Sequence, residues 1–296
     1  MKNLLTITVS VLLALPAGAS LITYDGFDYA ASTNLDGLNG GSGWQNGWQN
    51  QNSGFPTLSN ITVQSPGLSS GSLVVSGNQT TANTFDSTGR RLDVSFGGAW
   101  DTAGYVSDPF LITQIDQGNV WGSFLARRNS ATASWDGGPA FSLHRNNTDW
   151  FKDSNTSLQV LWDSSASIWT ANVNGGTSQN LSATGLGDTA LFVFKLELST
   201  SGTNNIYLWL NPSSLGGADL ATGTADASFT GLASADARFK AFAFYGGGSV
   251  SNATTLDEVR FGTDYASVTP IPEPGSLALV AVALLSAVLM RRSRAA

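Results

Sequence analysis

Few residues in this sequence are able to do chemistry. The chain of 296 residues contains no cysteine and one histidine, His144, which excludes thiol catalysis, cysteine-ligated metals and histidine-rich metal sites. Upstream of Glu273 the only glutamates are Glu197 and Glu258. A glycoside hydrolase of the two-carboxylate type needs carboxyl groups on both sides of the scissile bond, and neither glutamate lies in a Glu-x-Asp-x-x-Glu-like motif. His144 lacks serine and aspartate partners at recognisable spacing, so we expect a surface histidine and no catalytic residue.

The remaining carboxyl groups have ordinary structural explanations. Glu197 follows Lys195 at the two-residue spacing of a strand, which predicts an ion pair on a solvated face. Glu258 stands in the same relation to Arg260, and we expect that pair on a solvated face as well. Asp257 is expected on the opposite, apolar side of the same strand, where backbone N–H groups would satisfy it.

Three aspartates near the N-terminus, Asp25, Asp28 and Asp36, form the one group with metal-binding potential. Carboxylate oxygens suit calcium, but this segment lacks the dense Asp-x-Asp spacing of a calcium loop. Turns favour aspartate in any case. The sequence therefore predicts no cofactor and leaves a structural calcium ion as the alternative.

Nine tryptophans are the least ordinary feature of the composition. Trp44 and Trp48 lie in a Gly/Asn-rich stretch, where exposed rings would stack on sugar faces; the alternative is that they cover the end of a β-sandwich. The alternating segments Leu191–Leu198 and Ile206–Leu210 predict a hairpin whose outward side chains meet. A glycan-binding surface would then consist of Lys195, Glu197, Tyr207, Trp209, Trp44 and Trp48.

Alternation of apolar and polar residues predicts strands throughout the middle of the chain, whereas helix signals are weak. Further strands are predicted at 92–96, 121–126, 158–162, 168–173, 239–245 and 256–261. The tract Val173–Thr177 contains Asn-Gly-Gly, which predicts a tight hairpin turn. The sequence therefore predicts one all-β domain, an antiparallel β-sandwich over residues 20–269.

Several motifs of this domain resemble a known family. They are the segments Tyr24–Tyr29, Leu38–Trp44, Val120–Leu125, Tyr207–Pro212 and Leu256–Gly262. Together they are similar to LamG-like domains, which implies a concanavalin A-like jelly roll whose first and last strands pair.

The N-terminal residues 1–19 have the parts of a secretory signal peptide. Lys2 supplies the positive charge, an apolar stretch follows, and Ala17 and Ala19 form a small-x-small cleavage site. We expect this segment to be a signal helix that signal peptidase removes, which leaves Ser20 as the first residue.

The C-terminal residues 270–296 have three parts in a fixed order. An extended motif, Pro272-Glu273-Pro274, precedes an apolar stretch at 276–290, and an arginine cluster closes the chain at Arg291, Arg292 and Arg294. The apolar stretch is short for a hydrocarbon core of ~30 Å, but terminal arginines can snorkel and favour the cytoplasmic side. We therefore expect a C-terminal transmembrane helix.

This order of motifs resembles the PEP-CTERM sorting tail of Gram-negative bacteria, which is also labelled an ice-binding-protein C-terminal domain. The resemblance implies that exosortase processes a precursor anchored in the inner membrane. The protein would then pass to the cell surface or to an exopolysaccharide matrix.

The net charge of the domain limits the kinds of molecule that it is expected to bind. Removal of residues 1–19 and of everything after Pro274 takes away four of the 14 basic residues and no acidic residue. The domain is left with 10 basic against 21 acidic residues, a net charge of −11. This balance argues against nucleic acid. We therefore expect an exported, non-enzymatic β-sandwich with a structural or adhesive role, or one that binds extracellular polysaccharide. The alternative is a glycoside hydrolase or polysaccharide lyase on a laminarinase-type jelly roll, with Glu197 and an aspartate as catalysts.

Overall fold

A computed structural model of the chain describes most of the β domain and the first three residues of the C-terminal tail. The described residues are 20–50, 61–82, 87–110, 114–129, 139–145, 156–163, 165–181, 184–245 and 254–272. The predicted signal peptide (1–19) and the tail from Glu273 onward, with Pro274 and the three arginines, lie outside this part of the chain.

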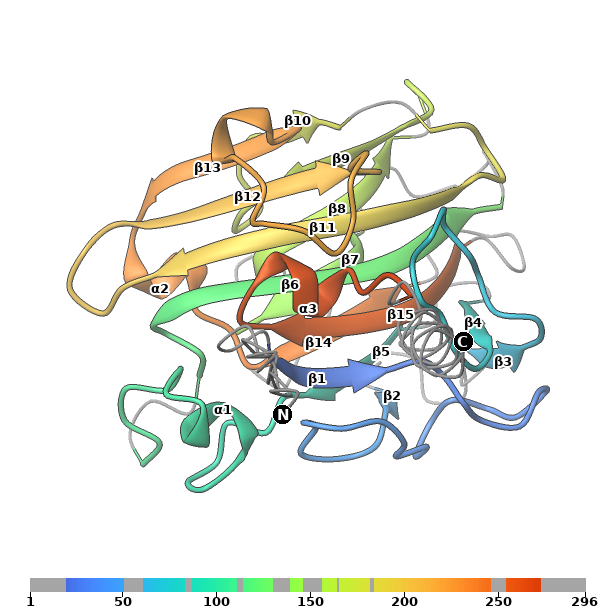
Figure 1. The fold of residues 1–296 in the computed structure, drawn as a ribbon, viewed down its shortest axis with the longest axis horizontal. Helices are drawn as coiled ribbons and strands as arrows, with labels where there is room; N and C mark the ends of the chain where they lie inside the picture. The colour runs from blue at the N-terminus through green and yellow to red at the C-terminus, as the bar shows by residue number, and fades with distance from the viewer. Residues whose placement is uncertain are drawn as a thin grey trace, which may run out of the picture.

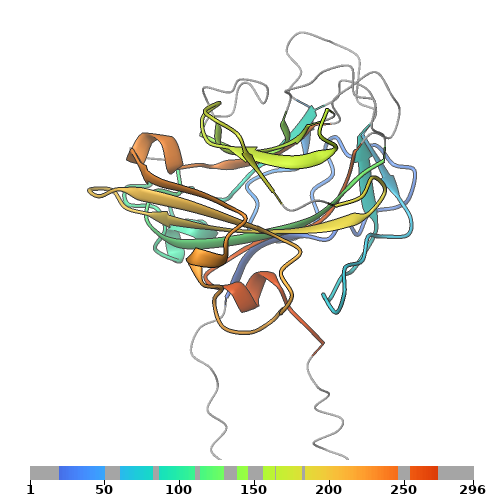
Figure 2. The same cartoon turned by 90° about the horizontal axis from the view of Figure 1, so that it is seen from above.

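Two antiparallel sheets pack face to face (Figure 1, Figure 2). Sheet A contains, in spatial order, β13 (Ala227–Leu232), β12 (Asn204–Leu210), β11 (Thr189–Leu198), β6 (Gly118–Arg128), β15 (Thr254–Gly262), β4 (Gln79–Ala82) and β3 (Thr62–Gln64), and β1 (Leu21–Asp25) also pairs with β15. Sheet B contains β10 (Gln179–Asn180), β9 (Ile168–Asn172), β8 (Thr156–Asp163), β7 (Pro139–His144), β14 (Ala241–Tyr245), β5 (Ser87–Arg91) and β2 (Gln49–Asn50). The predicted β-sandwich is therefore confirmed.

Helix is confined to short turns in the described part of the chain. These are α1 (Ala99–Thr102), α2 (Ser234–Ala237), α3 (Tyr265–Val268) and the 3-10 turn η2 (Thr222–Thr224). Among the described residues no helix is long and apolar enough to cross a membrane. The predicted transmembrane stretch at 276–290 is not among them.

The local pairings follow the sequence closely. β11 and β12 form the predicted hairpin, with Lys195 opposite Tyr207. The Asn-Gly turn joins β9 to β10, and Asn174 adopts the positive φ of 52° that such turns require. β1 and β15, the first and last strands, pair as the jelly-roll resemblance implies.

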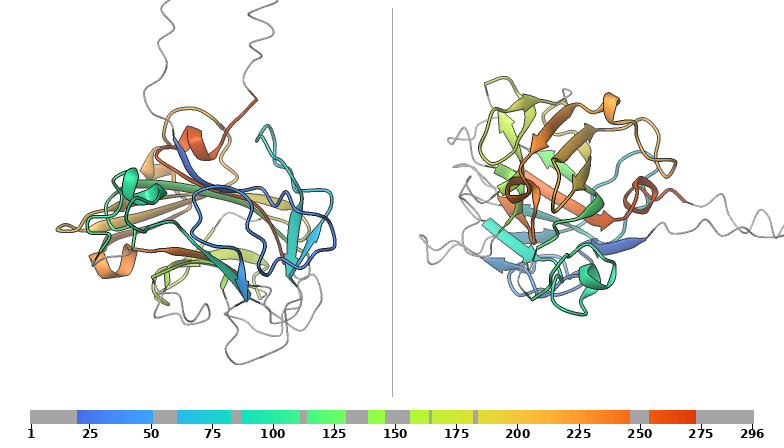
Figure 3. Two further views of the ribbon diagram at one scale, coloured as in Figure 1. Left: turned by 90° about the horizontal axis from the view of Figure 1, so that it is seen from below. Right: turned by 90° about the vertical axis from the view of Figure 1, so that its left-hand side faces the viewer.

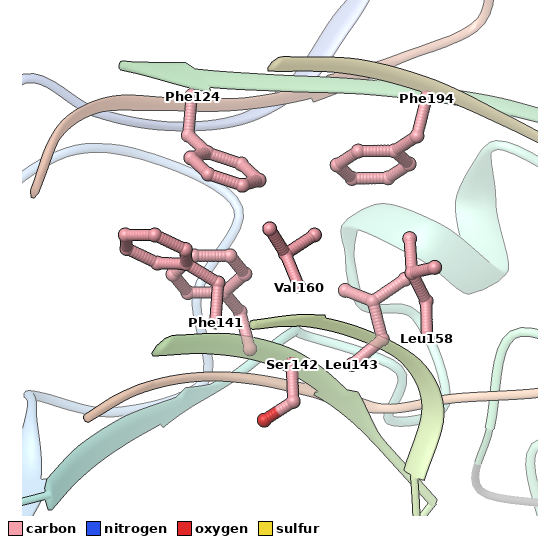
Figure 4. A pocket seen from close by; sticks show the side chains of 8 residues that line it. Phe124, Phe141, Ser142, Leu143, Leu158, Val160 and Phe194 are labelled. Carbon is pink, nitrogen blue, oxygen red and sulfur yellow. The ribbon is translucent and has the colours of Figure 1, made fainter. Parts of the chain in front are cut away.

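The core between the sheets is built from aromatic rings. Phe124 and Phe194 of sheet A face Phe141 of sheet B, and the centroids of the Phe124 and Phe141 rings lie 4.5 Å apart (Figure 4). A cavity of about 10 Å³ remains among these apolar side chains. One water molecule needs about this volume and also polar partners, so this cavity is too small for a ligand.

One strand departs from the predicted alternation. A β-bulge shifts the register of β15 between Asp257 and Arg260, and Glu258 has a positive φ of 55°. The bulge directs Asp257 away from the core, toward Leu68, so its predicted place on the apolar side is wrong. Glu258 is fully buried and pairs with Arg260, so the predicted solvated face for this pair is wrong as well.

Candidate functional site

The outer face of the β11–β12 hairpin brings together the residues that the sequence assigned to it. The Lys195 Nζ lies 2.8 Å from a carboxylate oxygen of Glu197, and Asn205 donates a hydrogen bond to the other oxygen at 3.0 Å. Burial acts to raise the pKa of Glu197, but the hydrogen bonds from Lys195 and Asn205 outweigh burial and hold this pKa below its usual value. Glu197 is therefore ionised and held in an ion pair, as the sequence predicts.

Trp209 is not a sugar-stacking platform, because its ring is buried. It is 3% exposed, it stacks on Trp121 at a centroid distance of 5.5 Å, and its indole N–H donates to Thr224. The segment after β12 thus covers this part of sheet A, as Figure 2 shows on its outer side. The expected glycan-binding role of Trp209 is removed by this packing, whereas Tyr207 stays half-buried beside it.

Trp48 and Asp25 belong to a second buried cluster. Asp25 accepts hydrogen bonds from the Trp48 indole at 2.8 Å and from the Tyr29 hydroxyl at 2.8 Å, and Arg90 lies 2.5 Å from the same oxygen. Trp48 is fully buried and contacts the half-buried Trp44. These rings cover the end of the sandwich, which is the alternative that the sequence left open.

The contacts of Asp25 also bear on the calcium alternative. Its carboxylate is occupied by the Arg90 guanidinium and by two side-chain donors. In the described residues no three acidic or histidine side chains gather closely enough to hold a metal ion, and calcium binding by Asp25, Asp28 and Asp36 stays a prediction of the sequence.

His144 lies on the outer face of sheet B and is fully buried, so the predicted surface position is wrong. Its Nε2 lies 2.6 Å from the hydroxyl of Ser142, which points away from the core cavity (Figure 4). Gln159 is opposite Ser142 on β8. The sequence showed that His144 faces away from Phe141 and Leu143, but alternation alone carries no information on what covers a sheet face.

A cleft at the end of sheet B is the strongest candidate site. Most of its lining residues come from the segment leading from β5 to α1 and from the segment leading from α2 into β14. The helices α1 and α2 sit at the same end of the sandwich (Figure 1, Figure 3). Its volume is about 230 Å³, and its lining comprises Gln45, Arg91, Leu92, Val94, Ser95, Phe96, Pro109 and Lys240.

One wall of the cleft comes from a segment that the sequence predicts to be a strand. The predicted strand at 92–96 is instead a loop that follows Arg91, the last residue of β5. Only Leu92 keeps a strand-like contact, an isolated bridge to Trp44. The loop carries Ser95 and Phe96 to the mouth of the cleft.

An aromatic pair stands exposed at this mouth. Phe96 is 70% exposed and Phe110 is 74% exposed, and their rings stack at a centroid distance of 4.9 Å. Large exposed apolar groups that touch each other usually mark a binding surface. This pair is not predicted from the sequence, where its only indication is a phenylalanine in each of two Gly- or Asp-rich segments.

Removal of the Glu197 charge tests the role of the hairpin face. The change Glu197→Gln is expected to lower the free energy of unfolding by no more than about 1 kcal/mol, because partly exposed ion pairs stabilise little. Chemical denaturation measures this difference, and Lys195→Met is the matched variant. A loss of more than about 3 kcal/mol would contradict the assignment, since only buried pairs cost that much to break.

Comparison with known proteins identifies a sorting signal in this chain. The fold itself is an antiparallel β-sandwich of two sheets. No curated protein sequence matches the chain. Residues 270–294 match the PEP-CTERM protein-sorting motif, so the chain carries this sorting signal. The motif implies an exported, surface-sorted protein that exosortase processes.

The similar solved structures share little sequence with this chain. An endo-β-1,4-glucuronan lyase from the fungus Trichoderma reesei is 14% identical over 81% of this chain and 97% of that chain, with a TM-score of 0.43. A Trypanosoma rangeli sialidase is 9% identical over 83% of this chain and 36% of that chain, with a TM-score of 0.39. An alginate lyase is 15% identical over 50% of this chain and 72% of that chain, with a TM-score of 0.32. At these identities and TM-scores, neither the fold nor the activity of this chain is inferred from the three structures.

Proposed function

We propose that this exported protein is a non-catalytic carbohydrate-binding β-sandwich that makes structural or adhesive contact with extracellular polysaccharide. The observation that carries the proposal is the exposed Phe96–Phe110 stack at the mouth of the cleft. The two rings leave apolar surface in water, and covering it with the C–H face of a sugar is favourable. Gln45 and Ser95 line the same cleft and supply polar groups for sugar hydroxyls.

The size of the cleft supports contact with a polysaccharide chain. Its volume of about 230 Å³ is below that of a typical pocket for a free small ligand, ~300–1,000 Å³. A site of this size suits one sugar residue of a polymer that continues across the surface of the domain. A matrix polysaccharide has this form.

The sorting signals support the same role. PEP-CTERM sorting would deliver the domain to the surface or matrix, where such polymers occur. Removal of residues 1–19 by signal peptidase would leave β1 whole, since β1 begins at Leu21. Ser20 then stays in place through its backbone N–H, which donates to the Thr263 hydroxyl at 3.1 Å.

Replacement of the aromatic pair tests the proposal. The full-length protein, purified in detergent, is tested by co-sedimentation on a neutral β-glucan, on alginate and on polygalacturonate. The changes Phe96→Ser and Phe110→Ser are each expected to weaken binding about 10-fold, because buried aromatic contacts dominate such interfaces.

The control variant is Leu186→Ser, which removes an exposed apolar side chain elsewhere in the domain. It should bind as the unchanged protein does. Failure of the unchanged protein to bind any of these polymers would sink the proposal. Binding that survives both phenylalanine changes would place the site away from the cleft.

An enzyme of the lyase or hydrolase class is the alternative function. The Ser142 hydroxyl lies 2.6 Å from an imidazole nitrogen of His144, but both side chains are buried, so a polymer does not reach them in this structure. Release of reducing ends or unsaturated products from the same polymers would establish the alternative. Glu197 has a different part in the fold, because it is held by Lys195 and Asn205.

A further inference from the structure

Two of the cations described in this acidic domain lie together at the cleft. Four basic side chains are matched with carboxylates, in the pairs Arg90–Asp25, Arg145–Asp236, Lys195–Glu197 and Arg260–Glu258. Arg91 and Lys240 both line the cleft, and in the described residues neither forms a salt bridge. Two like charges therefore line one cleft, and neither forms a salt bridge with a described carboxylate.

The backbone fixes these two cations beside each other. Arg91 ends β5 opposite Ala241 of β14, and Lys240 immediately precedes that residue. The N–H of Leu92 donates to the carbonyl of Lys240 at 2.9 Å, which ties the two segments together. Burial lowers the pKa of Lys240, and the charge of Arg91 lowers it further. The arrangement costs stability in the absence of an anion, and an anion in the cleft would offset that cost.

We propose that the cleft binds the anionic groups of an acidic polysaccharide, an inference that rests on the proposed carbohydrate-binding function. A guanidinium forms paired hydrogen bonds with a carboxylate or sulfate, and an ammonium adds a second charge. Phe96 covers the sugar face while Arg91 and Lys240 bind its charged substituent. A domain of net charge −11 repels polyanions over most of its surface, and Arg91 and Lys240 supply a local attraction that offsets this repulsion.

The test compares one polymer with and without its charge. Full-length protein in detergent is titrated with polygalacturonate, with the same polymer after complete methyl esterification, with a sulfated glucan and with the unmodified neutral glucan. Polygalacturonate is expected to bind at least about 10-fold more tightly than its methyl ester, and this preference should shrink as salt is added.

Single variants then assign the preference to the cleft. Arg91→Met and Lys240→Met should each remove most of the preference for the charged polymer, whereas Phe96→Ser should weaken binding of every polymer that binds. The matched control is Arg127→Met, which removes a cation that hydrogen-bonds Asn129 at the end of β6. This control should keep the preference, and thermal unfolding confirms that each variant is folded.

The outcomes separate the two proposals. Equal binding of the charged polymer and its ester, or an unchanged preference in both cleft variants, overturns the anionic ligand and leaves carbohydrate binding intact. Absence of binding to every polymer overturns both proposals. Preference for the sulfated glucan over the neutral one supports the anionic class and assigns sulfate as the charged group.

Discussion

Replacement of Arg90 by methionine is expected to lower the free energy of unfolding by about 3–5 kcal/mol, because it leaves a buried carboxylate without its partner. Arg90 is 1% exposed, lies 2.5 Å from Asp25 and donates to the carbonyl of Asn46 at 2.7 Å. Burial raises the pKa of Asp25, and the charge of Arg90 is the largest effect that opposes this rise. The loss should therefore be smaller at acidic pH, where Asp25 of the variant takes up a proton.

The neighbouring change Arg91→Met is the natural control for this experiment. Arg91 lies at the cleft and has no salt bridge among the described residues, so its removal should change stability by less than about 1 kcal/mol. Chemical denaturation of both variants gives the comparison. If both changes cost the same, the Arg90–Asp25 pair has no special role. The double change Asp25→Leu/Arg90→Met should recover part of the loss, because no unpaired charge then remains.

The second large effect is a dependence of stability on pH that arises from Asp257. Burial, followed by the charge of Glu258, raises the pKa of Asp257 from 3.8 to about 9. Below pH 3.8 both the folded and unfolded chains carry the proton, so this group has no effect on the slope there. Between that value and about pH 9 only the folded chain keeps the proton. Stability should therefore fall with rising pH, by as much as about 1.4 kcal/mol for each unit.

Denaturation at several pH values measures this slope, and Asp257→Asn is the informative variant. An amide does not titrate, so the free energy of unfolding of the variant should fall less steeply between pH 5 and 8. The difference is about 1.4 kcal/mol for each pH unit, which corresponds to one proton. The comparison concerns the slope alone, since asparagine also loses one of the two backbone hydrogen bonds from Leu68 and Glu258. An identical slope in both proteins would show that Asp257 is already ionised at neutral pH.

The sequence predicted the parts of the fold that depend on local alternation. The β11–β12 hairpin follows from one apolar and one polar face, and the register brings Lys195 and Tyr207 together as expected. The Asn-Gly turn after β9 follows equally from local backbone preference. In both cases the interactions that decide the structure lie within a few residues of each other.

The predictions were wrong where segments distant in the sequence determine whether a side chain is buried. Asp257 and Glu258 follow the strand pattern, yet a bulge and the segment at Leu68 bury both. Trp48 stands in a loop-like sequence but is buried against Asp25, 23 residues earlier in the chain. Burial of this kind depends on tertiary packing, which a single sequence pattern does not encode.

The cleft was beyond prediction for the same reason. Arg91 and Lys240 are far apart in the sequence and meet because β5 pairs with β14. Phe96 and Phe110 stack across two loops with no periodic pattern. The shortage of catalytic groups could be predicted because it depends on composition alone. The sorting tail could be predicted because it is a short linear motif.

The pairing of β1 with β15 has a mechanical consequence. β15 also pairs with β6 and β4 in sheet A, and the described chain ends shortly after it, at Pro272. The carbonyl of Pro270 accepts a hydrogen bond from Val74 at 2.8 Å, and that of Val268 accepts one from Ser123 at 2.6 Å. Tension applied through the tail would load β15 along its length, so its hydrogen bonds would have to break together in shear and not one by one in peeling. A domain loaded through this tail would therefore resist extension at β15 itself.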